Sequence, residues 1–432
     1  MNEKTMPVYN PGDIAVINAI INKNGLRWEK APEDGSFIPD DCVLYEYLTW
    51  KGVQWSNDEM NKRITGLNIS DKYISGELNV TGLTMLKHLN CSYNRLKVLD
   101  VSGLTHLELL NCNLNNLKVL NVTDSTKLEI LDCSDNYLTE FSAYGLVKLK
   151  KFNCNNNRLY KLNLGGLTKL KSFDCSWNLL TELNVSDSTK LKVLICNHNS
   201  LISINVSGLS LLKRFECNNT TLVEIDVTSL EALKTFSCKQ NKLAKLNVSG
   251  LTMLEELDCS LNQLTVLELS DLTKLEELDC SFNKLTVLDV PGLTQLEELS
   301  CSNNQLTVLD LSALTLLKTL SCYSNQLTTL NLSGLARLEK LCCNNNQLNV
   351  LDVSGLTSLE ELNCDENRLA TLDVSKLTAL KTLECAMNQL TVLDLSSLEK
   401  LEMLNCVSNR LASISFSGLC RVKEFSIDKN FL

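Results

Sequence analysis

The stretch Leu254–Lys274, LEELDCSLNQLTVLELSDLTK, decides the fold, because the chain repeats its pattern every 21 residues. With Leu254 as position 1, apolar residues fall at positions 1, 4, 6, 11, 14, 16 and 19. Leu257 and Cys259 alternate with Glu256 and Asp258, which is the period-two pattern of a half-buried strand. A unit this short cannot bury its apolar face alone, so the units are predicted to stack in parallel as the coils of a solenoid.

Cysteine and asparagine mark the register of these coils. Sixteen cysteines, from Cys91 to Cys406, stand 21 residues apart at position 6, and an asparagine follows each at position 9, with Thr220 as the one departure. No insertion or deletion interrupts this spacing. The pattern therefore predicts a single repeat array over residues 64–432, of about 17 coils, with a degenerate final coil at Phe425–Asn430.

The ladder cysteines are predicted to be buried free thiols. Stacked parallel strands place equivalent Cα atoms about 4.8 Å apart, but their Cβ atoms remain equally far apart, beyond the roughly 3.8 Å that a disulfide prefers. The sequence has no C-x-x-C pair for zinc, and cysteine is a common core residue. The asparagines are expected to point inward and to bond backbone groups of neighbouring coils. Thr220 offers fewer such bonds and predicts a locally weaker coil.

The pattern L-x-x-L-x-C-x-x-N-x-L resembles the leucine-rich-repeat family, with cysteine replacing a strand leucine, and the cysteine ladder resembles bacterial internalin-like proteins of the internalin J type. This resemblance implies an α/β leucine-rich-repeat solenoid, mostly β and loop. We expect a right-handed superhelix with a parallel concave β-sheet, an extended or short-strand convex side and an N-terminal helical cap.

Residues 1–63 differ in composition and are predicted to form that cap. Asp13–Asn24 places Ile14, Ile17, Ala19, Ile20 and Ile21 largely on one side of a helix, with Asp13 as N-cap and Gly25 as C-cap. The segment Trp50–Trp55, WKGVQW, resembles the W-x-G-V strand that follows the cap helix of many leucine-rich-repeat proteins. Cap disulfides common in such proteins are not expected here, because Cys42 has no local partner.

Composition and motifs exclude several classes of function. The 432 residues carry a net charge of −10, which argues against a nucleic-acid partner. No apolar run is long enough to insert in a membrane, and the first residues do not have the pattern of an intact signal peptide, which leaves open a signal that has been removed. No nucleotide-binding, G-x-S-x-G or H-E-x-x-H motif occurs, and the three histidines are predicted to lie where they cannot pair with inward cysteines. We therefore expect no enzyme activity, no cofactor and no metal.

Alternation places positions 3, 5 and 7, with position 8 beside them, on the concave surface. At position 8, Trp177 and His198 are one coil apart, and large apolar residues also replace the Asn or Ser found elsewhere. Aromatic anchors favour binding, although scattered exposed hydrophobic residues are also normal. The predicted binding residues are Trp177, His198, Tyr93, Leu109, Ile130, Val193, Ile195, Lys151 and Arg214, with Lys171 and Lys192 steering an acidic partner.

Charge is segregated along the array. Lys148–Lys245 holds fifteen basic against seven acidic residues, whereas Leu254–Cys301 holds eleven acidic against two basic residues. Like charges stack at positions 3 and 5 of the second stretch and repel one another. A cationic protein patch or Ca²⁺ would relieve this repulsion, and duplication of the unit explains it equally well. The predicted secondary acidic patch is Glu256, Asp258, Glu277, Asp279 and Glu298.

These observations predict a non-enzymatic scaffold for protein–protein interaction. The internalin-like resemblance implies a monomeric bacterial protein, extracellular or on the cell surface, that binds a protein ligand such as a host protein through its concave face. The alternative is an intracellular assembly or inhibitor scaffold, which the lack of a signal peptide and the lone Cys42 would suit.

Overall fold

The structure is a computed structural model that describes residues 8–39, 50, 52–415 and 421–430. Cys42 and Cys420, two of the cysteines outside the ladder, lie outside the described residues. The chain divides into two compact units, Met1–Leu212 and Lys213–Leu432, and each is described by itself.

The first unit begins with the predicted cap helix, α1 (Pro11–Asn24). It starts two residues before the predicted N-terminus, because Asn10 is the N-cap and its side chain accepts a hydrogen bond from the Asp13 backbone N–H at 3.1 Å. The predicted stop is confirmed, since Gly25 has a φ of 61° and donates its N–H to the Ile21 carbonyl. Ile14, Ile17, Ile20 and Ile21 are buried as predicted, whereas Ala19 is exposed.

Asp13, which the sequence suggested as the N-cap, instead fastens α1 to the first coil. Its carboxylate is fully buried and accepts hydrogen bonds from Arg63 Nε at 3.0 Å, Arg63 Nη2 at 2.9 Å and the Ile64 N–H at 2.7 Å. A bidentate pair with an additional backbone donor compensates for the burial of this charge. The W-x-G-V segment forms β1 (Val53–Trp55), which pairs antiparallel with the first strand of the array.

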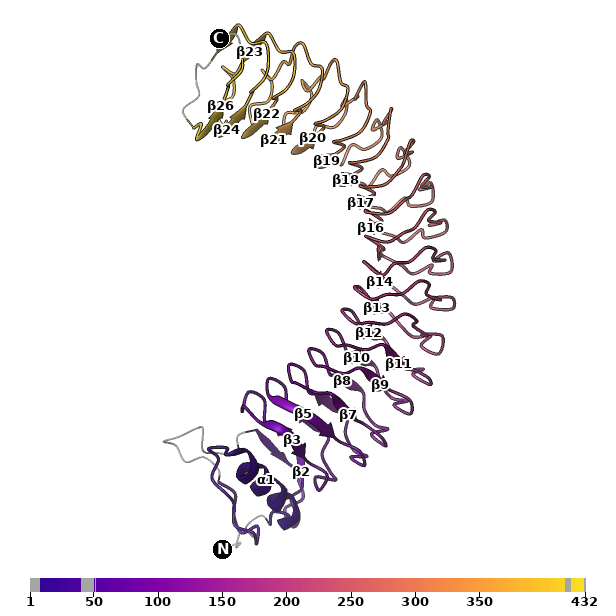
Figure 1. Ribbon diagram of the computed structural model, residues 1–432, viewed down its shortest axis with the longest axis vertical. Helices are drawn as coiled ribbons and strands as arrows, with labels where there is room; N and C mark the ends of the chain where they lie inside the picture. Colours follow the sequence, from indigo (N-terminus) through magenta and orange to yellow (C-terminus); the bar gives the residue numbers. More distant parts are fainter. Residues whose placement is uncertain (1–7, 40–49, 51, 416–420, 431–432) are drawn as a thin grey trace, which may run out of the picture. The chain divides into compact units, whose positions relative to one another are not determined.

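Each coil contributes one short strand, here called a primary strand, to a parallel sheet (Figure 1). Paired residues of neighbouring ladder strands are one repeat apart, as in Leu109 with Ile130 and Glu256 with Glu277. In the first unit the primary strands are β2 (Ile64–Asn68), β4 (His88–Asn90), β6 (Leu109–Asn111), β8 (Ile130–Asp132), β10 (Lys151–Asn153), β12 (Ser172–Asp174) and β13 (Val193–Ile195). In the second unit they are β14 (Arg214–Glu216), β15 (Thr235–Ser237), β16 (Glu256–Asp258), β17 (Glu277–Asp279), β18 (Glu298–Ser300), β19 (Thr319–Ser321), β20 (Lys340–Cys342), β21 (Glu361–Asn363), β22 (Thr382–Glu384), β24 (Met403–Asn405) and β26 (Glu424–Ser426). The predicted parallel-strand solenoid of about 17 coils is confirmed.

The return path of each coil is extended and carries a second, interrupted set of strands. In the first unit these are β3 (Ser75–Asn79), β5 (Arg95–Asp100) and β7 (Val119–Asn121), which form one sheet, and β9 (Glu140–Ser142) with β11 (Lys161–Asn163), which form another. In the second unit β23 (Val392–Asp394) pairs with β25 (Ser413–Ser415). Within the described residues α1 is the only α-helix, in agreement with the predicted N-terminal helical cap and coils of strand and extended chain.

The core of every coil is built from the repeating leucines and the ladder cysteines. The side chains of Cys91 to Cys406 in the ladder are fully buried reduced thiols, as predicted. Position 4 carries phenylalanine in several coils, and Phe152 and Phe173 stack with ring centroids 5.3 Å apart. Burial of aliphatic and aromatic area in this continuous core is the main stabilising force of a stacked array.

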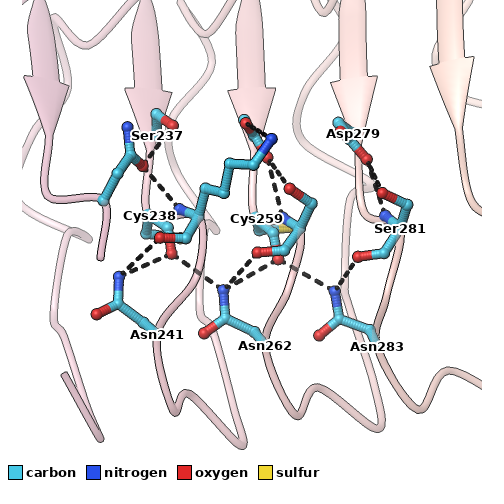
Figure 2. A network of polar contacts seen from close by, with 12 residues as sticks. Ser237, Cys238, Asn241, Cys259, Asn262, Asp279, Ser281 and Asn283 are labelled. Atoms are coloured by element: carbon cyan, nitrogen blue, oxygen red, sulfur yellow. Dashed lines mark hydrogen bonds and ion pairs between the residues drawn. The ribbon is translucent and has the colours of Figure 1, made fainter. Parts of the chain in front are cut away.

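The asparagines at position 9 join adjacent coils by hydrogen bonds (Figure 2). Asn262 shows the arrangement: its Nδ2 donates to the carbonyls of Cys238, Cys259 and Ser260 at 3.0–3.1 Å, and its Oδ1 accepts from the Leu243 N–H at 3.0 Å. One side chain therefore satisfies backbone groups of its own coil and of the preceding one, as the sequence predicted.

Position 7 differs from the prediction, because serines there are buried instead of lying on the outer surface. Ser281, for example, donates from its hydroxyl and its N–H to Asp279 Oδ1 at 2.5 and 2.9 Å (Figure 2). This hydrogen-bonded turn, formed by the Asp279 side chain, ends the strand and leaves the side chain at position 7 buried.

Candidate functional site

The outer face of the primary sheet in the first unit carries a continuous row of position 3 side chains. Leu109, Ile130 and Lys151 pair directly across neighbouring strands, and the row continues through Ser172 to Val193. Leu109, Ile130, Val193 and the position 5 residue Ile195 are half-buried, and Lys151 is exposed. The structure thus places these predicted residues on one face, where their apolar side chains line a surface open to solvent.

Trp177 and His198 form a stacked aromatic pair at one edge of this face. Their ring centroids lie 3.7 Å apart with an interplanar angle of 13°. The Trp177 side chain is 58% exposed, which confirms that it is not part of the core, and His198 is half-buried. Tyr93 is also exposed at 60%, but it lies four coils before Trp177, or about 19 Å at strand spacing, and so does not belong to the same contact.

Every position 8 residue in the ladder adopts the left-handed backbone conformation, which sequence reasoning missed. Trp177 has a φ of 56°, His198 of 52° and Phe282 of 54°. This conformation suits Gly, Asn and Asp and costs other residues on the order of 1–2 kcal/mol. The signal was present in the sequence, because Asn, Asp and Ser recur at this position in other coils.

Basic side chains of the same unit precede the primary strands, whereas the aromatic pair follows them. Lys150, Lys171 and Lys192 occupy position 2 of three consecutive coils and Lys151 lies beside them at position 3. Lys150 is paired with Glu129 at 2.7 Å, whereas Lys171 and Lys192 have no ion pair among the described residues. Arg214 belongs to the second unit and pairs with Glu216 at 2.5 Å, so its charge is largely compensated within its own strand.

In the second unit the predicted acidic patch is a row of strand neighbours. Glu256 pairs in register with Glu277, and Glu277 with Glu298, and all three side chains are exposed. Partial burial, followed by repulsion from Glu298 and Glu256, raises the pKa of Glu277 above its usual value. Asp258 lies 3.8 Å from Lys239, whereas the three glutamates form no ion pair within the part of the chain that the structure describes. The row lines a hollow of about 460 Å³ with residues of β14 to β19.

The chemistry available for catalysis on these faces is limited. Burial raises the pKa of the Cys91 thiol to about 12 and raises the pKa of the Cys259 thiol well above its usual value, so the thiolate form is suppressed. No cluster of three or more His, Cys, Asp or Glu side chains in the described ranges is arranged to hold a metal ion. No helix in those ranges is long and apolar enough to cross a bilayer.

Comparisons with known proteins identify the family. The family model for leucine-rich repeats in two copies matches residues 294–335. A functional domain of internalin J from Listeria monocytogenes, whose structure includes a cysteine ladder, is 30% identical, with 82% of this chain and 71% of that chain covered at a TM-score of 0.62. The chain belongs to the leucine-rich-repeat family. Its 21-residue coils with a cysteine ladder are of the internalin J type, as the sequence predicted.

Two further leucine-rich-repeat structures are similar. A leucine-rich-repeat protein of Leptospira interrogans is 26% identical, covering 81% of this chain and 91% of that chain at a TM-score of 0.67. YopM from Yersinia enterocolitica is 23% identical, covering 85% and 87% at a TM-score of 0.64, and this likeness shows the fold alone. No curated protein matches the chain. Leucine-rich-repeat proteins are scaffolds for protein interaction, which sets the class of function for this member.

Proposed function

We propose that this leucine-rich-repeat protein is a non-enzymatic recognition scaffold that binds an acidic segment of a partner protein on the predicted concave face, with Trp177 as the anchor. The stack of Trp177 on His198 carries the proposal. A 58% exposed tryptophan gains little from burial, yet it occupies a left-handed backbone position that is unfavourable for a bulky residue. Because every ladder coil shares this conformation, the exposed aromatic surface of the pair, and not its backbone, favours a binding role.

Other residues of the first unit favour a partner that is acidic and partly apolar. Leu109, Ile130 and Val193 supply apolar contact area along the position 3 row, and Lys171 and Lys192 supply positive charge that no described acidic side chain neutralises. Apolar and aromatic contact area combined with charged side chains at the margin is the usual composition of a protein interface. The acidic patch of the second unit is proposed as a secondary contact for a basic part of a partner.

The internalin-type resemblance supports a secreted or surface-exposed bacterial protein that acts as a monomer and recognises a host protein, and we place the proposed function there. An intracellular assembly scaffold is the second candidate. Because both candidates use the same face, the identity of the partner distinguishes them: an extracellular host protein supports the first, and a bacterial cytoplasmic protein supports the second.

The test begins with a photoreactive amino acid placed at exposed Leu179, two residues after Trp177, so that Trp177 itself is kept, and, as control, at exposed Val119 on the return path. The cross-linked partner is then purified and its affinity measured by biolayer interferometry. Trp177→Ala should raise the Kd about 30-fold, which corresponds to about 2 kcal/mol, whereas Val119→Ala should change it less than twofold. An unchanged Kd for Trp177→Ala would remove the anchor from the proposal.

A further inference from the structure

The return side of the first unit contains a hollow of about 730 Å³ that the proposed protein-binding face does not use. It lies where the return strands are interrupted, because β7 pairs with β5 and β9 pairs with β11, but no pairing joins β7 to β9 (Figure 1). Its volume is within the range of about 300–1,000 Å³ typical of small-molecule sites. The lining comes from β7, β9 and β11 and from the turns that follow β7 and β9.

The floor of the hollow comes from the coil that contains β9. Phe141 and Leu146 of the same coil line the hollow and are almost completely buried, so its floor is apolar.

Tyr144 provides an aromatic wall on this hollow. Its side chain is 75% exposed, and its Cδ2 atom is 3.6 Å from the point where Gly165 of the next coil would carry a Cβ. The ring therefore lies close to the backbone of Gly165, with most of its surface open to solvent. An exposed ring beside a partly apolar floor is a stacking platform for a ligand that has an apolar face.

Polar groups of several kinds surround the platform. Glu140 accepts a hydrogen bond from the Tyr160 hydroxyl, which fixes the position of its carboxylate. Asn163 accepts from the Gly165 N–H at 3.0 Å through Oδ1, and its Nδ2 group has no acceptor among the described residues. Lys161 adds an ammonium group, and Asp124 a second carboxylate, on the same lining.

This combination points to one class of ligand. Two carboxylates with one ammonium disfavour an anionic ligand, and the ammonium group opposes a strongly cationic one. Carboxylate, amide and ammonium groups together can accept from and donate to neighbouring hydroxyls, and the Tyr144 ring can cover a face of C–H groups. Because sugars have both features, we infer that the hollow between β7 and β9 binds a neutral oligosaccharide.

The test probes the full chain on an array of neutral, sialylated and sulfated oligosaccharides, with titration calorimetry on the best neutral ligand. Tyr144→Ala removes the platform, and Thr126→Trp, at an exposed lining residue, blocks the hollow without removing a buried group. The matched control is Tyr73→Ala, since Tyr73 is 72% exposed and does not line the hollow.

We expect the unchanged protein to bind at least one neutral oligosaccharide at millimolar concentration or below. Tyr144→Ala and Thr126→Trp should each weaken that binding at least tenfold, whereas Tyr73→Ala should change it less than twofold, with unchanged circular dichroism for all three. The inference is overturned if no neutral oligosaccharide binds at millimolar concentration, if only charged glycans bind, or if both hollow variants bind as the unchanged protein does. None of these outcomes bears on Trp177, so the two proposals fail independently.

Discussion

The hydrogen bonds of Asn262 allow the stabilising effect of one position 9 asparagine to be estimated. In an Asn262→Ala variant the carbonyls of Cys238 and Cys259 each keep one partner, because the side chains of Asn241 and Asn283 also donate to them, and Ser260 keeps the Gln240 N–H. The Leu243 N–H, however, loses its acceptor inside a buried part of the coil. Leaving one buried donor unsatisfied costs about 1–3 kcal/mol, and the loss of the other bonds brings the expected total to about 2–4 kcal/mol.

The free energy of unfolding from urea denaturation measures this loss, and native-state hydrogen exchange locates it. The amide of Leu243 should exchange faster in Asn262→Ala, while amides in coils far from this asparagine should change less, since repeats interact mainly with their neighbours. Gln263→Ala, at the exposed next residue, is the control and should stay within about 0.5 kcal/mol of the unchanged protein. A cost below about 0.5 kcal/mol for Asn262→Ala, with unaltered exchange at Leu243, would refute the assignment of the ladder as a structural requirement.

Three further predictions concern stability. Burial, assisted by the nearby Glu384 and Glu366, raises the pKa of Asp365 to about 6. The stability that its protonated form contributes is therefore full below the unfolded pKa near 4 and is lost as pH rises through 6. Asp365→Asn should flatten the pH dependence of the free energy of unfolding in urea between about pH 4 and 7, and an unchanged pH profile would contradict this. Cys259→Ser should destabilise more than Cys259→Ala, by about 1–2 kcal/mol in thermal or chemical unfolding, because the hydroxyl enters an apolar core, and equal losses would argue against a dry ladder. Trp177→Asn should be more stable than Trp177→Ala by up to about 1 kcal/mol because Asn tolerates a positive φ, and the reverse order would show that the backbone at position 177 is not strained.

Most of the fold follows from the repeat itself. An uninterrupted spacing of 21 residues fixes the stacking, and the alternation around Cys259 fixes which side chains enter the core, so the strands, the buried thiols and the role of Asn262 were all predictable. The cap was predictable only in outline. Asp13 has the residue type of an N-cap, but its burial depends on Arg63, which is 50 residues away in the sequence and reaches it only through tertiary packing.

The candidate sites were predictable in part. The stack of Trp177 on His198 follows from the 21-residue spacing, but the left-handed backbone at position 8 depends on the turn that leads into the buried asparagine. The pairing of Arg214 with Glu216 depends on rotamers that periodicity does not specify. The hollow beside Tyr144 was not foreseen, because it lies at an interruption of the return strands that a uniform spacing of 21 residues does not indicate.

Hydroxyl-radical footprinting of the complex with the cross-linked partner tests the proposed recognition surface most directly, since it reads the solvent exposure of aromatic side chains on every face in one experiment. The account predicts that oxidation of Trp177 and His198 falls severalfold on binding, while oxidation of Tyr144 and Tyr73, which are exposed elsewhere on the first unit, stays the same. Unchanged oxidation of Trp177 in a saturated complex would contradict the account, because the partner would then bind without covering the residue on which the proposal depends.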